Sequence, residues 1–560
     1  MGKGLKKEID GANRTTLSEL TYNELGQLID KKLGGNLQSV DYKYSIRGWL
    51  TDINNPSDLT AAANLDAHDD LFAMRLNYNT KETGVQVNDN LLQFNGNISS
   101  VVWNTKDKAR NAYAYSYDEL NRITGSDYKT TISGAMAESQ AYEERNLGYD
   151  LNGNINRLIR TNVSGAVAED FTYTYSGNQL SAINSGTAYA YDANGNMNTD
   201  GLKGFSVEYN LLNLPSKVSK GTENVSYIYS AAGAKLAKKQ NGAFKQLYTG
   251  SLVYNESRLL DYILNEEGMV VKSGGDYSYQ YYLKDHLGNT RVVFDQAGVV
   301  KQVADYYPFG SRHVPFNPES SNKYLFGGKE LQDDDLGGVQ LGVYDYGARF
   351  YDPQIGRWMC IDPLAEQYRR WSPYNYGMNN PIRFIDPDGM GIWDVINAIG
   401  RGAVDNTLGT NTRASYSPTD AGQYNGVLNQ VDAGMAITGA MMAGAGGAEA
   451  TGGAVSLALA TSGETAGLSL VAVGAGLAQA AVGSAWMMNG AKNLGEGNHY
   501  GEDNKTHGNS ANSEKPSGNY ENTHESGKTY NGVGDEKRMN QSAGNVSKKN
   551  TFRIGCSRSF

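Results

Sequence analysis

Residues Arg349 to Met390 read RFYDPQIGRWMCIDPLAEQYRRWSPYNYGMNNPIRFIDPDGM. Three Asp-Pro pairs begin at Asp352, Asp362 and Asp386, with a Gly-Arg-Trp and an Asn-Asn-Pro among them. Asp and Pro both favour turns, because Asp bonds nearby backbone N–H groups and Pro presets φ. So many turn-formers, mixed with aromatic residues of the kind that are usually buried, predict a compact plug and not a linker. We call residues 349–390 the core block.

The composition of the whole chain favours β structure. Among 560 residues, Gly (67) and Tyr (38) are abundant while Pro (12) is scarce, as expected for many short strands closed by glycine turns. The net charge is −10, so no basic field covers the molecule and we expect no nucleic-acid binding by its main body. The N-terminus lacks the apolar segment of a signal peptide, and we expect the chain to be part of a longer protein.

A repeated unit runs along the first half of the chain. It consists of Tyr, then Asp or Asn, two variable residues, Gly or Asn, and an apolar residue shortly after. Copies begin at Tyr22, Tyr117, Tyr149, Tyr191 and Tyr209.

Each repeat has the pattern of a β-hairpin. Aromatic residues alternate with small or polar residues in 171–175 and 113–117, which predicts strands with one buried face. The Asp-x-x-Gly-Asn that follows can bond its own backbone and adopt positive φ, so it predicts the turn. One hairpin cannot bury its aromatic face alone, so neighbouring hairpins must pair into a long sheet.

These residues resemble the YD-repeat, or RHS-repeat, proteins of bacteria. The resemblance covers residues 15–391 and includes Asp41–Leu50, Tyr282–Arg291, Asp305–Gly310 and the core block, in the order that the family shows. It implies a mainly β fold in which the hairpin array winds into a hollow shell and the core block closes one end. We therefore expect YD repeats over 1–300 and an RHS-repeat-associated core over 301–391.

The resemblance also implies self-cleavage just after the last Asp-Pro-x-Gly. Here the scissile bond would be Met390–Gly391 or lie within a residue or two of it. Two neighbouring aspartates can divide the chemistry, because one stays protonated as the acid while the other activates water. The candidates are Asp362 and Asp386, with Asp352 and Asp388 in reserve and with Arg349 and Arg357 as supporting cations. The family often has Leu or Trp where this chain has Met390.

The same residues also have a purely structural interpretation. Asp-Pro pairs form turns, and the aromatic residues of the core block would then only fill the plug. His286 and His313 are expected to be hydrogen-bonded repeat or loop residues. The spacing of His and Cys predicts no metal centre, and no cofactor is expected.

The composition changes after the core block. Residues 433–491 carry only two charges, Glu449 and Glu464, and are rich in Gly and Ala. We expect a helical segment over 392–491. Its uncharged run 465–491 is long enough to span a bilayer, although tight packing against protein is equally allowed. Residues 492–560 are expected to be disordered or a truncated effector.

A short stretch of that tail is similar to the opening of GIY-YIG nucleases. Tyr520, Tyr530 and Arg538 match its two tyrosines and its arginine, but both central isoleucines are replaced and no glutamate for the metal can be placed. A chance Gly/Tyr-rich linker is the alternative. No nuclease activity is expected from this chain.

Two functions remain open from the sequence. The first is the C-terminal shell of a secreted polymorphic toxin that encloses, and releases by self-cleavage, its own C-terminal segment for use against other bacteria. Its partners would be an upstream delivery module and an immunity protein, and residues 433–491 could contact a membrane. The second is a cell-surface structural or adhesive repeat protein without enzymatic activity, whose tyrosine-rich faces would bind carbohydrate or another surface.

Overall fold

The computed structural model describes residues 3–7, 15–61, 68–85, 91–273, 275–313, 322–367 and 370–390, and five short strands beyond them. Contacts divide the chain into two units, 1–393 with 454–473, and 394–453 with 474–560. The first unit contains the described residues up to Met390 and two of the short strands, and the second contains the other three.

A sheet of 14 strands forms the first part of the wall. Its strands are β1 (Lys3–Lys7), β2 (Thr15–Tyr22), β3 (Leu28–Leu33), β4 (Gln38–Tyr44), β5 (Leu50–Ile53), β6 (Phe72–Asn77), β7 (Ser100–Thr105), β8 (Asn111–Tyr117), β9 (Ile123–Ile132), β10 (Ala135–Glu138), β11 (Glu144–Tyr149), β12 (Ile155–Thr161), β13 (Val167–Ser176) and β14 (Gln179–Ile183).

A second sheet of 13 strands continues the wall. Its strands are β15 (Ala190–Tyr191), β16 (Met197–Asp200), β17 (Phe205–Tyr209), β18 (Pro215–Lys220), β19 (Glu223–Tyr229), β20 (Lys235–Gln240), β21 (Ala243–Thr249), β22 (Leu252–Tyr254), β23 (Leu260–Asn265), β24 (Gly268–Ser273), β25 (Asp276–Lys284), β26 (Thr290–Asp295) and β27 (Val300–Val303).

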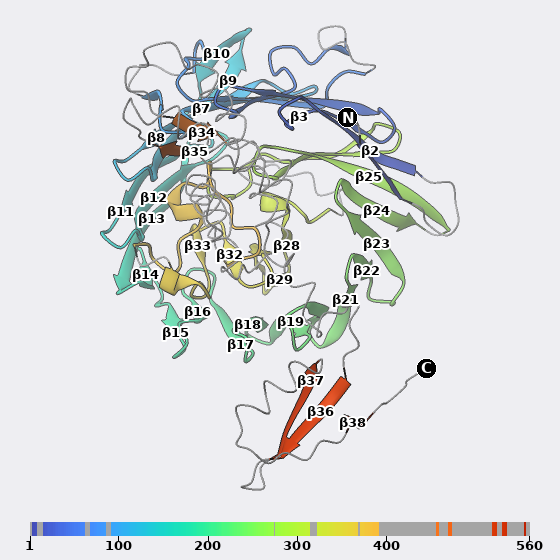
Figure 1. Cartoon of the computed structure of the whole chain (residues 1–560). Coiled ribbons are helices and arrows are strands. Elements are labelled where there is room, and N and C mark those ends of the chain that lie inside the picture. The colour runs from blue at the N-terminus through green and yellow to red at the C-terminus, as the bar shows by residue number, and fades with distance from the viewer. Residues whose placement is uncertain are drawn as a thin grey trace, which may run out of the picture. The chain divides into compact units, whose positions relative to one another are not determined.

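Nearly all neighbours in both sheets are consecutive antiparallel strands, so the mainly β hairpin array predicted from the repeats is confirmed. The wall curves round until its two ends meet (Figure 1). There Lys31 Nζ on β3 lies 2.7 Å from Glu267 Oε2, in the turn between β23 and β24.

The segment after β27 lies on the inner side of this wall, and we call residues 304–390 the plug (Figure 1). Its elements are η2 (Phe326–Gly328), β28 (Glu330–Gln332), β29 (Asp335–Leu336), β30 (Val339–Gln340), β31 (Val343–Asp345), β32 (Phe350–Asp352), β33 (Arg357–Trp358), η3 (Ala365–Gln367) and η4 (Gly377–Asn379).

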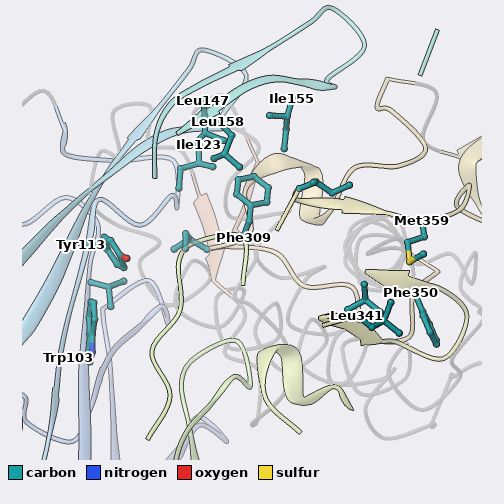
Figure 2. Packing of buried hydrophobic residues seen from close by; sticks show 14 of the residues in the cluster. Trp103, Tyr113, Ile123, Leu147, Ile155, Leu158, Phe309, Leu341, Phe350 and Met359 are labelled. Carbon is teal, nitrogen blue, oxygen red and sulfur yellow. The ribbon is translucent and has the colours of Figure 1, made fainter. Parts of the chain in front are cut away.

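One hydrophobic core joins the plug to both sheets. Phe309, Phe350 and Met359 of the plug belong to the same buried cluster as Ile123 and Leu158 of the wall (Figure 2). The wall strands therefore bury their inner face against the plug as well as against one another.

The repeat chemistry explains the hairpin turns. In the repeat at Tyr149, Asp150 Oδ1 accepts the N–H groups of Asn152 (2.9 Å) and Asn154 (2.8 Å). Gly153 takes the positive φ of 81° that this turn needs. The same two bonds recur at Asn23, Asp118, Asp192, Asn210, Asn255, Asp285 and Asp295.

The repeat tyrosines connect each hairpin to an earlier one. Tyr149 donates its hydroxyl to the carbonyl of Ile123 at 2.5 Å, and Tyr175 donates to Ile155 at 2.5 Å. The acceptors are the apolar residues that close earlier repeats. A tyrosine thus satisfies its hydroxyl inside the wall, where an unpaired polar group would be costly.

The predicted single buried face holds for 171–175 but not for 113–117. In β13, Phe171 and Tyr173 are buried and the threonines between them are exposed. In β8, both faces are buried, because Ala112 and Ala114 pack with Val85 and Val102 on the second face.

The turn glycines differ in what surrounds them, which gives a testable contrast. Gly195 and Gly298 both have positive φ, 78° and 77°. A Cβ at Gly195 would collide with Ile361 and Tyr374 of the plug. A Cβ at Gly298 would have no other atom within 4 Å. We expect Gly298→Ala to lower the free energy of unfolding by about 1–2 kcal/mol through φ alone. Gly195→Ala should cost more than this, because the end of the Ile361 side chain and the Tyr374 hydroxyl would have to move. Equal losses in denaturant titrations would contradict this packing.

Beyond the plug, the described residues are short strands. β34 (Val455–Ala458) pairs with β35 (Ser469–Ala472) in the first unit, and β36 (Gly518–Thr523), β37 (Thr529–Gly534) and β38 (Ile554–Gly555) form a small sheet in the second. The prediction of helix for 392–491 is thus wrong at 455–458 and 469–472, where Val- and Leu-containing segments form backbone pairs with each other. The rest of 392–491 lies outside the described residues. None of the helices that the structure describes has the length and apolarity needed to cross a membrane.

Candidate functional site

Arg349 brings Asp362 and Asp386 together. One guanidinium nitrogen, Nη2, lies 3.0 Å from Asp362 Oδ2 and 2.8 Å from Asp386 Oδ2. Arg349 and Asp386 are almost completely buried, at 1% and 2% side-chain exposure, and Asp362 is 11% exposed. Two carboxylates that are 24 residues apart in the chain therefore share one donor in a nearly dry environment.

The surrounding plug holds the guanidinium of Arg349 in place. Arg349 precedes β32, and Trp358 on the next strand lies under its guanidinium at 4.1 Å. The Nη1 atom points to the carbonyl of Pro373 at 3.4 Å. Stacking and a fork of donors fix this side chain in one orientation.

Asp386 opens a tight turn that ends at Gly389. Its Oδ1 accepts the Gly389 N–H at 2.8 Å, and Gly389 has a φ of 82°. A Cβ at Gly389 would lie 3.0 Å from the backbone nitrogen of Arg349 and 3.2 Å from Tyr346 Cβ. Glycine is therefore needed here both for its φ and for the close approach of the two backbones.

Asp362 holds its proton more tightly than an ordinary aspartate. Burial raises the pKa of its carboxyl to about 6, although Arg349 and the N–H of Leu364 oppose this shift. The Leu364 N–H donates to Asp362 Oδ1 at 2.7 Å, and the Asp362 N–H donates to the Pro373 carbonyl at 3.0 Å. At neutral pH a fraction of Asp362 is still protonated.

The same guanidinium also binds the backbone next to the predicted cleavage point. Arg349 Nε donates a short hydrogen bond to the carbonyl oxygen of Gly389. Met390 is held by its N–H, which donates to Asp388 Oδ1 at 2.9 Å. Gly391, the other predicted cleavage residue, lies outside the described residues.

A small cavity borders the two carboxylates. Arg349, Asp362 and Asp386 line it together with Trp371, Ser372 and Asn375, and its volume is about 20 Å³. This is room for about one water molecule, and the polar lining supplies hydrogen-bond partners.

The other predicted residues of the core block have different roles. Asp352 pairs with Lys203 of the wall at 2.6 Å, and burial raises its pKa. Arg357 donates to the Asn178 carbonyl at 2.7 Å and stacks over Tyr175, so it ties the plug to the wall. Asp388 holds backbone in place: its Oδ1 accepts the Met390 N–H, and its carbonyl accepts the Ala348 N–H at 3.1 Å.

Both histidines have the partners expected of packed residues. His286 Nε2 lies 2.9 Å from the Ile382 carbonyl, and His313 Nε2 lies 2.8 Å from the Tyr113 hydroxyl. Burial lowers the pKa of His313 to about 3. Within the described ranges, no cluster of three or more His, Cys, Asp or Glu side chains is arranged to hold a metal ion.

Tyr520 and Tyr530 of the nuclease-like stretch fall on β36 and β37. These strands are antiparallel, with Tyr520 opposite Gly532 and Tyr530 opposite Asn522. Arg538 lies outside the described residues.

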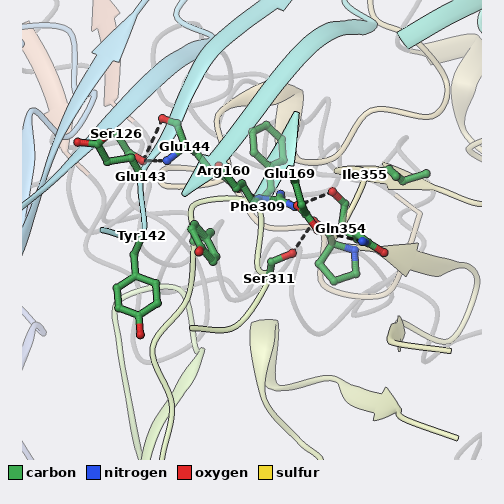
Figure 3. Close-up of polar contacts among 12 residues, drawn as sticks. Ser126, Tyr142, Glu143, Glu144, Arg160, Glu169, Phe309, Ser311, Gln354 and Ile355 are labelled. Carbon is green, nitrogen blue, oxygen red and sulfur yellow. Dashed lines mark hydrogen bonds and ion pairs between the residues drawn. The ribbon is translucent and has the colours of Figure 1, made fainter. Parts of the chain in front are cut away.

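Arg160 is an important residue that the repeat pattern did not reveal. From β12 it donates to Glu144 Oε1 at 2.7 Å, Glu169 Oε2 at 2.7 Å and the carbonyl of Pro353 at 2.9 Å (Figure 3). Its Nη1 also reaches the Gln354 carbonyl at 2.6 Å. The only sequence signal was a charged residue at an inward position of a strand.

The plug also binds directly to the repeat turns. Asn379 Nδ2 donates to the Gly153 carbonyl at 2.7 Å, Asn380 Nδ2 to the Asn121 carbonyl at 2.8 Å, and Tyr374 to the Gly195 carbonyl at 2.7 Å. The Asn-Asn-Pro of the core block therefore holds the turns of successive hairpins. This arrangement defines a YD-repeat β shell with the plug bound to its inner side (Figure 1).

The chain belongs to the Teneurin YD-shell family, whose model matches residues 64–382. It is 28% identical to salivary gland surface protein 1 of Aedes aegypti over 256 residues, which is 45% of this chain and 7% of that protein. It is 25% identical to the tRNA nuclease WapA of Bacillus subtilis (strain 168) over 292 residues, which is 44% of this chain and 12% of that protein.

The fold also matches a solved toxin component. The likeness to the Tc holotoxin pore of Photorhabdus luminescens, solved with a substitution in TccC3, has a TM-score of 0.52 at 21% identity. It covers 70% of this chain and 20% of that chain. The chain thus has a YD shell like that of a toxin, and it spans about a tenth of the length of the salivary gland protein and of WapA.

Proposed function

We propose that the chain is the shell of a secreted toxin that cuts itself after the plug and so frees its C-terminal segment. One observation carries the proposal: Arg349 contacts both Asp362 and Asp386 and, through Nε, the carbonyl of Gly389. Two acids, a cation and a peptide carbonyl within one buried cluster are the parts that peptide hydrolysis needs.

The chemistry divides between the two aspartates. Asp386, as a carboxylate, takes a proton from a water molecule, and the water oxygen attacks the Gly389 carbonyl carbon. Arg349 Nε stabilises the negative charge that develops on the carbonyl oxygen. Asp362, with its pKa near 6, gives its proton to the leaving amine of Met390. Burial strengthens each of these interactions because little water screens them.

This geometry favours the Gly389–Met390 bond, which is within the window predicted from the sequence and one residue before Met390–Gly391. The intact mass of the expressed chain tests this directly. A cut at the favoured bond gives an N-terminal fragment that ends at Gly389, and a cut at the next bond gives one that also contains Met390. A single uncut mass of 60.7 kDa from folded protein would remove the cleavage step.

The pH dependence of cleavage should follow the proton on Asp362. Below its pKa of about 6 the acid is protonated and able to donate. Above that pKa the protonated fraction falls about tenfold for each pH unit, and the cleavage rate should fall with it. Precursor isolated in denaturant and refolded at pH 5 to 8, with fragments quantified by mass, gives the profile. A rate that rises or stays level across this range would exclude Asp362 as the acid.

We also propose that the freed segment stays with the shell as cargo, that an upstream module delivers it, and that an immunity protein protects the producing cell. The toxin-like shell, the relative named as a tRNA nuclease and the change of composition after residue 391 support this view. A toxin of this kind acts on other cells, so we also propose that the protein is secreted or displayed on the cell surface. Size-exclusion chromatography of the cleaved protein should recover both pieces in one peak, whereas separate peaks would argue against retention.

The adhesive alternative is less well supported by the side chains. Tyr113, Tyr173 and Tyr281 are buried, and Tyr149 and Tyr175 use their hydroxyls on backbone carbonyls. These repeat tyrosines are therefore not offered to a carbohydrate or to another surface.

A further inference from the structure

We propose that Lys238 of the wall and Asp334 of the plug form an intramolecular isopeptide bond. This covalent link would join β20 to the segment between β28 and β29, independently of the proposed self-cleavage. Lys238 Nζ lies 2.5 Å from Asp334 Oδ2, and neither side chain has any solvent exposure.

This contact is both very close and completely buried. The amine of Lys238 and the carboxyl group of Asp334 are 2.5 Å apart, and water reaches neither side chain. An amine held this close to a carboxyl group in a dry site has the proximity that formation of an amide bond needs.

A second lysine, Lys245, binds the other oxygen of the Asp334 carboxyl group. Lys245 Nζ donates to Asp334 Oδ1 at 2.7 Å, so the two carboxyl oxygens have different environments. The charge of Lys245 can stabilise an oxyanion on Oδ1 while Oδ2 leaves. Glu330 of the plug, which also acts electrostatically on Lys238, is itself paired with Lys235 of the wall at 2.6 Å.

Burial favours the neutral amine of Lys238, which is its nucleophilic form. Loss of hydration lowers the pKa of its amine, although the charge of Asp334 opposes the shift. The two lysines hold the pKa of Asp334 below its usual value, so its carboxylate must first take a proton from Lys238 itself. In a dry site this transfer removes two buried charges, which offsets its cost.

The reaction balances without another reactant. A proton moves from the Lys238 ammonium to Asp334 Oδ2, and the resulting amine attacks Cγ. The Cγ–Oδ2 bond breaks, and Oδ2 leaves as water with two of the three ammonium hydrogens. The third hydrogen stays on the amide nitrogen, and the net charge does not change.

The pair of Lys203 and Asp352 is a matched control within the same chain. It also joins wall to plug, its Nζ–Oδ2 distance is 2.6 Å, and its side chains are only 7% and 2% exposed. Lys203 Nζ, however, also donates to the Leu341 carbonyl at 3.0 Å, which holds it as a hydrogen-bond donor, so we expect a salt bridge and no covalent link.

The experiment is mass spectrometry of the folded, full-length chain after denaturation. We expect the chain, or its N-terminal fragment if it cuts itself, to be lighter by one water molecule. Trypsin should then fail to cut after Lys238 and release a branched peptide in which Leu236–Lys239 is joined to Glu330–Arg349. Cleavage after Lys203 should be normal.

Two further samples make the result decisive. Protein that has never folded, because it was made and kept in denaturant, should have the mass calculated from its sequence. The folded variant Asp334→Ala should also have its calculated mass, without loss of water. A full mass for folded wild type, or a water loss that fragmentation assigns to any other residue, such as a dehydrated Asp-Gly, would overturn the proposal.

Discussion

The variant Asp386→Asn should stay uncut under conditions in which the wild-type chain separates after the plug. Asparagine cannot take a proton from water, so the loss of this base should slow cleavage by about 10²–10⁴-fold. The fold should survive, because the asparagine oxygen can still accept the Gly389 N–H and Arg349 keeps its contact with Asp362. Intact mass at successive times after refolding measures the rate.

The reserve residue provides the matched control. Asp388 lies two residues from Asp386, but its Oδ1 accepts the Met390 N–H, whereas Asp386 binds the Arg349 guanidinium. The oxygen of an asparagine at position 388 can still accept the Met390 N–H, so Asp388→Asn should cut at close to the wild-type rate. If Asp388→Asn blocks cleavage while Asp386→Asn does not, the assignment of the base is wrong. Equal thermal unfolding of the two variants would show that misfolding does not explain the difference.

Replacing Arg160 with alanine should give the largest loss of stability. Arg160 and Glu144 are 2% and 0% exposed, and removal of the cation would leave the Glu144 charge buried and two plug carbonyls without their donor. Breaking one partner of a buried pair costs about 3–5 kcal/mol. The free energy of unfolding, measured by denaturant titration, should fall by that amount.

Arg157 is the control for this prediction, since it lies on the same strand. Its pair with Asp170 is 41% and 47% exposed, and an exposed pair contributes about 0–1 kcal/mol. Arg157→Ala should therefore change stability little. Similar losses for the two variants would mean that the plug does not depend on the buried contacts of Arg160.

The repeat turns and strands could be predicted because their causes are local. Asp150, its two backbone donors and Gly153 lie within five consecutive residues, so the sequence contains the whole turn. Alternation along Phe171–Tyr175 likewise predicts which side is buried. Where a second layer covers the outer face, as at Ala112 and Ala114, the local pattern could not predict the burial of both faces.

The candidate site was only partly predictable. The Asp-Pro motif predicts Asp362 and Asp386 as the paired acids, and the fold does bring them to Arg349. The same motif also offered Asp352 and Arg357, which instead bind wall residues 149 to 203 positions away in the chain. All these Asp-Pro and Arg residues look alike in sequence, so spacing alone could not separate them.

The amino-acid sequence by itself therefore determined the hairpins, the positive-φ turns and the identity of the plug, because each depends on neighbours within a few residues. Only the tertiary structure decided which acids meet Arg349, which carbonyls Arg160 holds, and that Lys238 faces Asp334. Those partners come from distant segments, and a buried charge is satisfied by whichever opposite charge or dipole the packing places beside it.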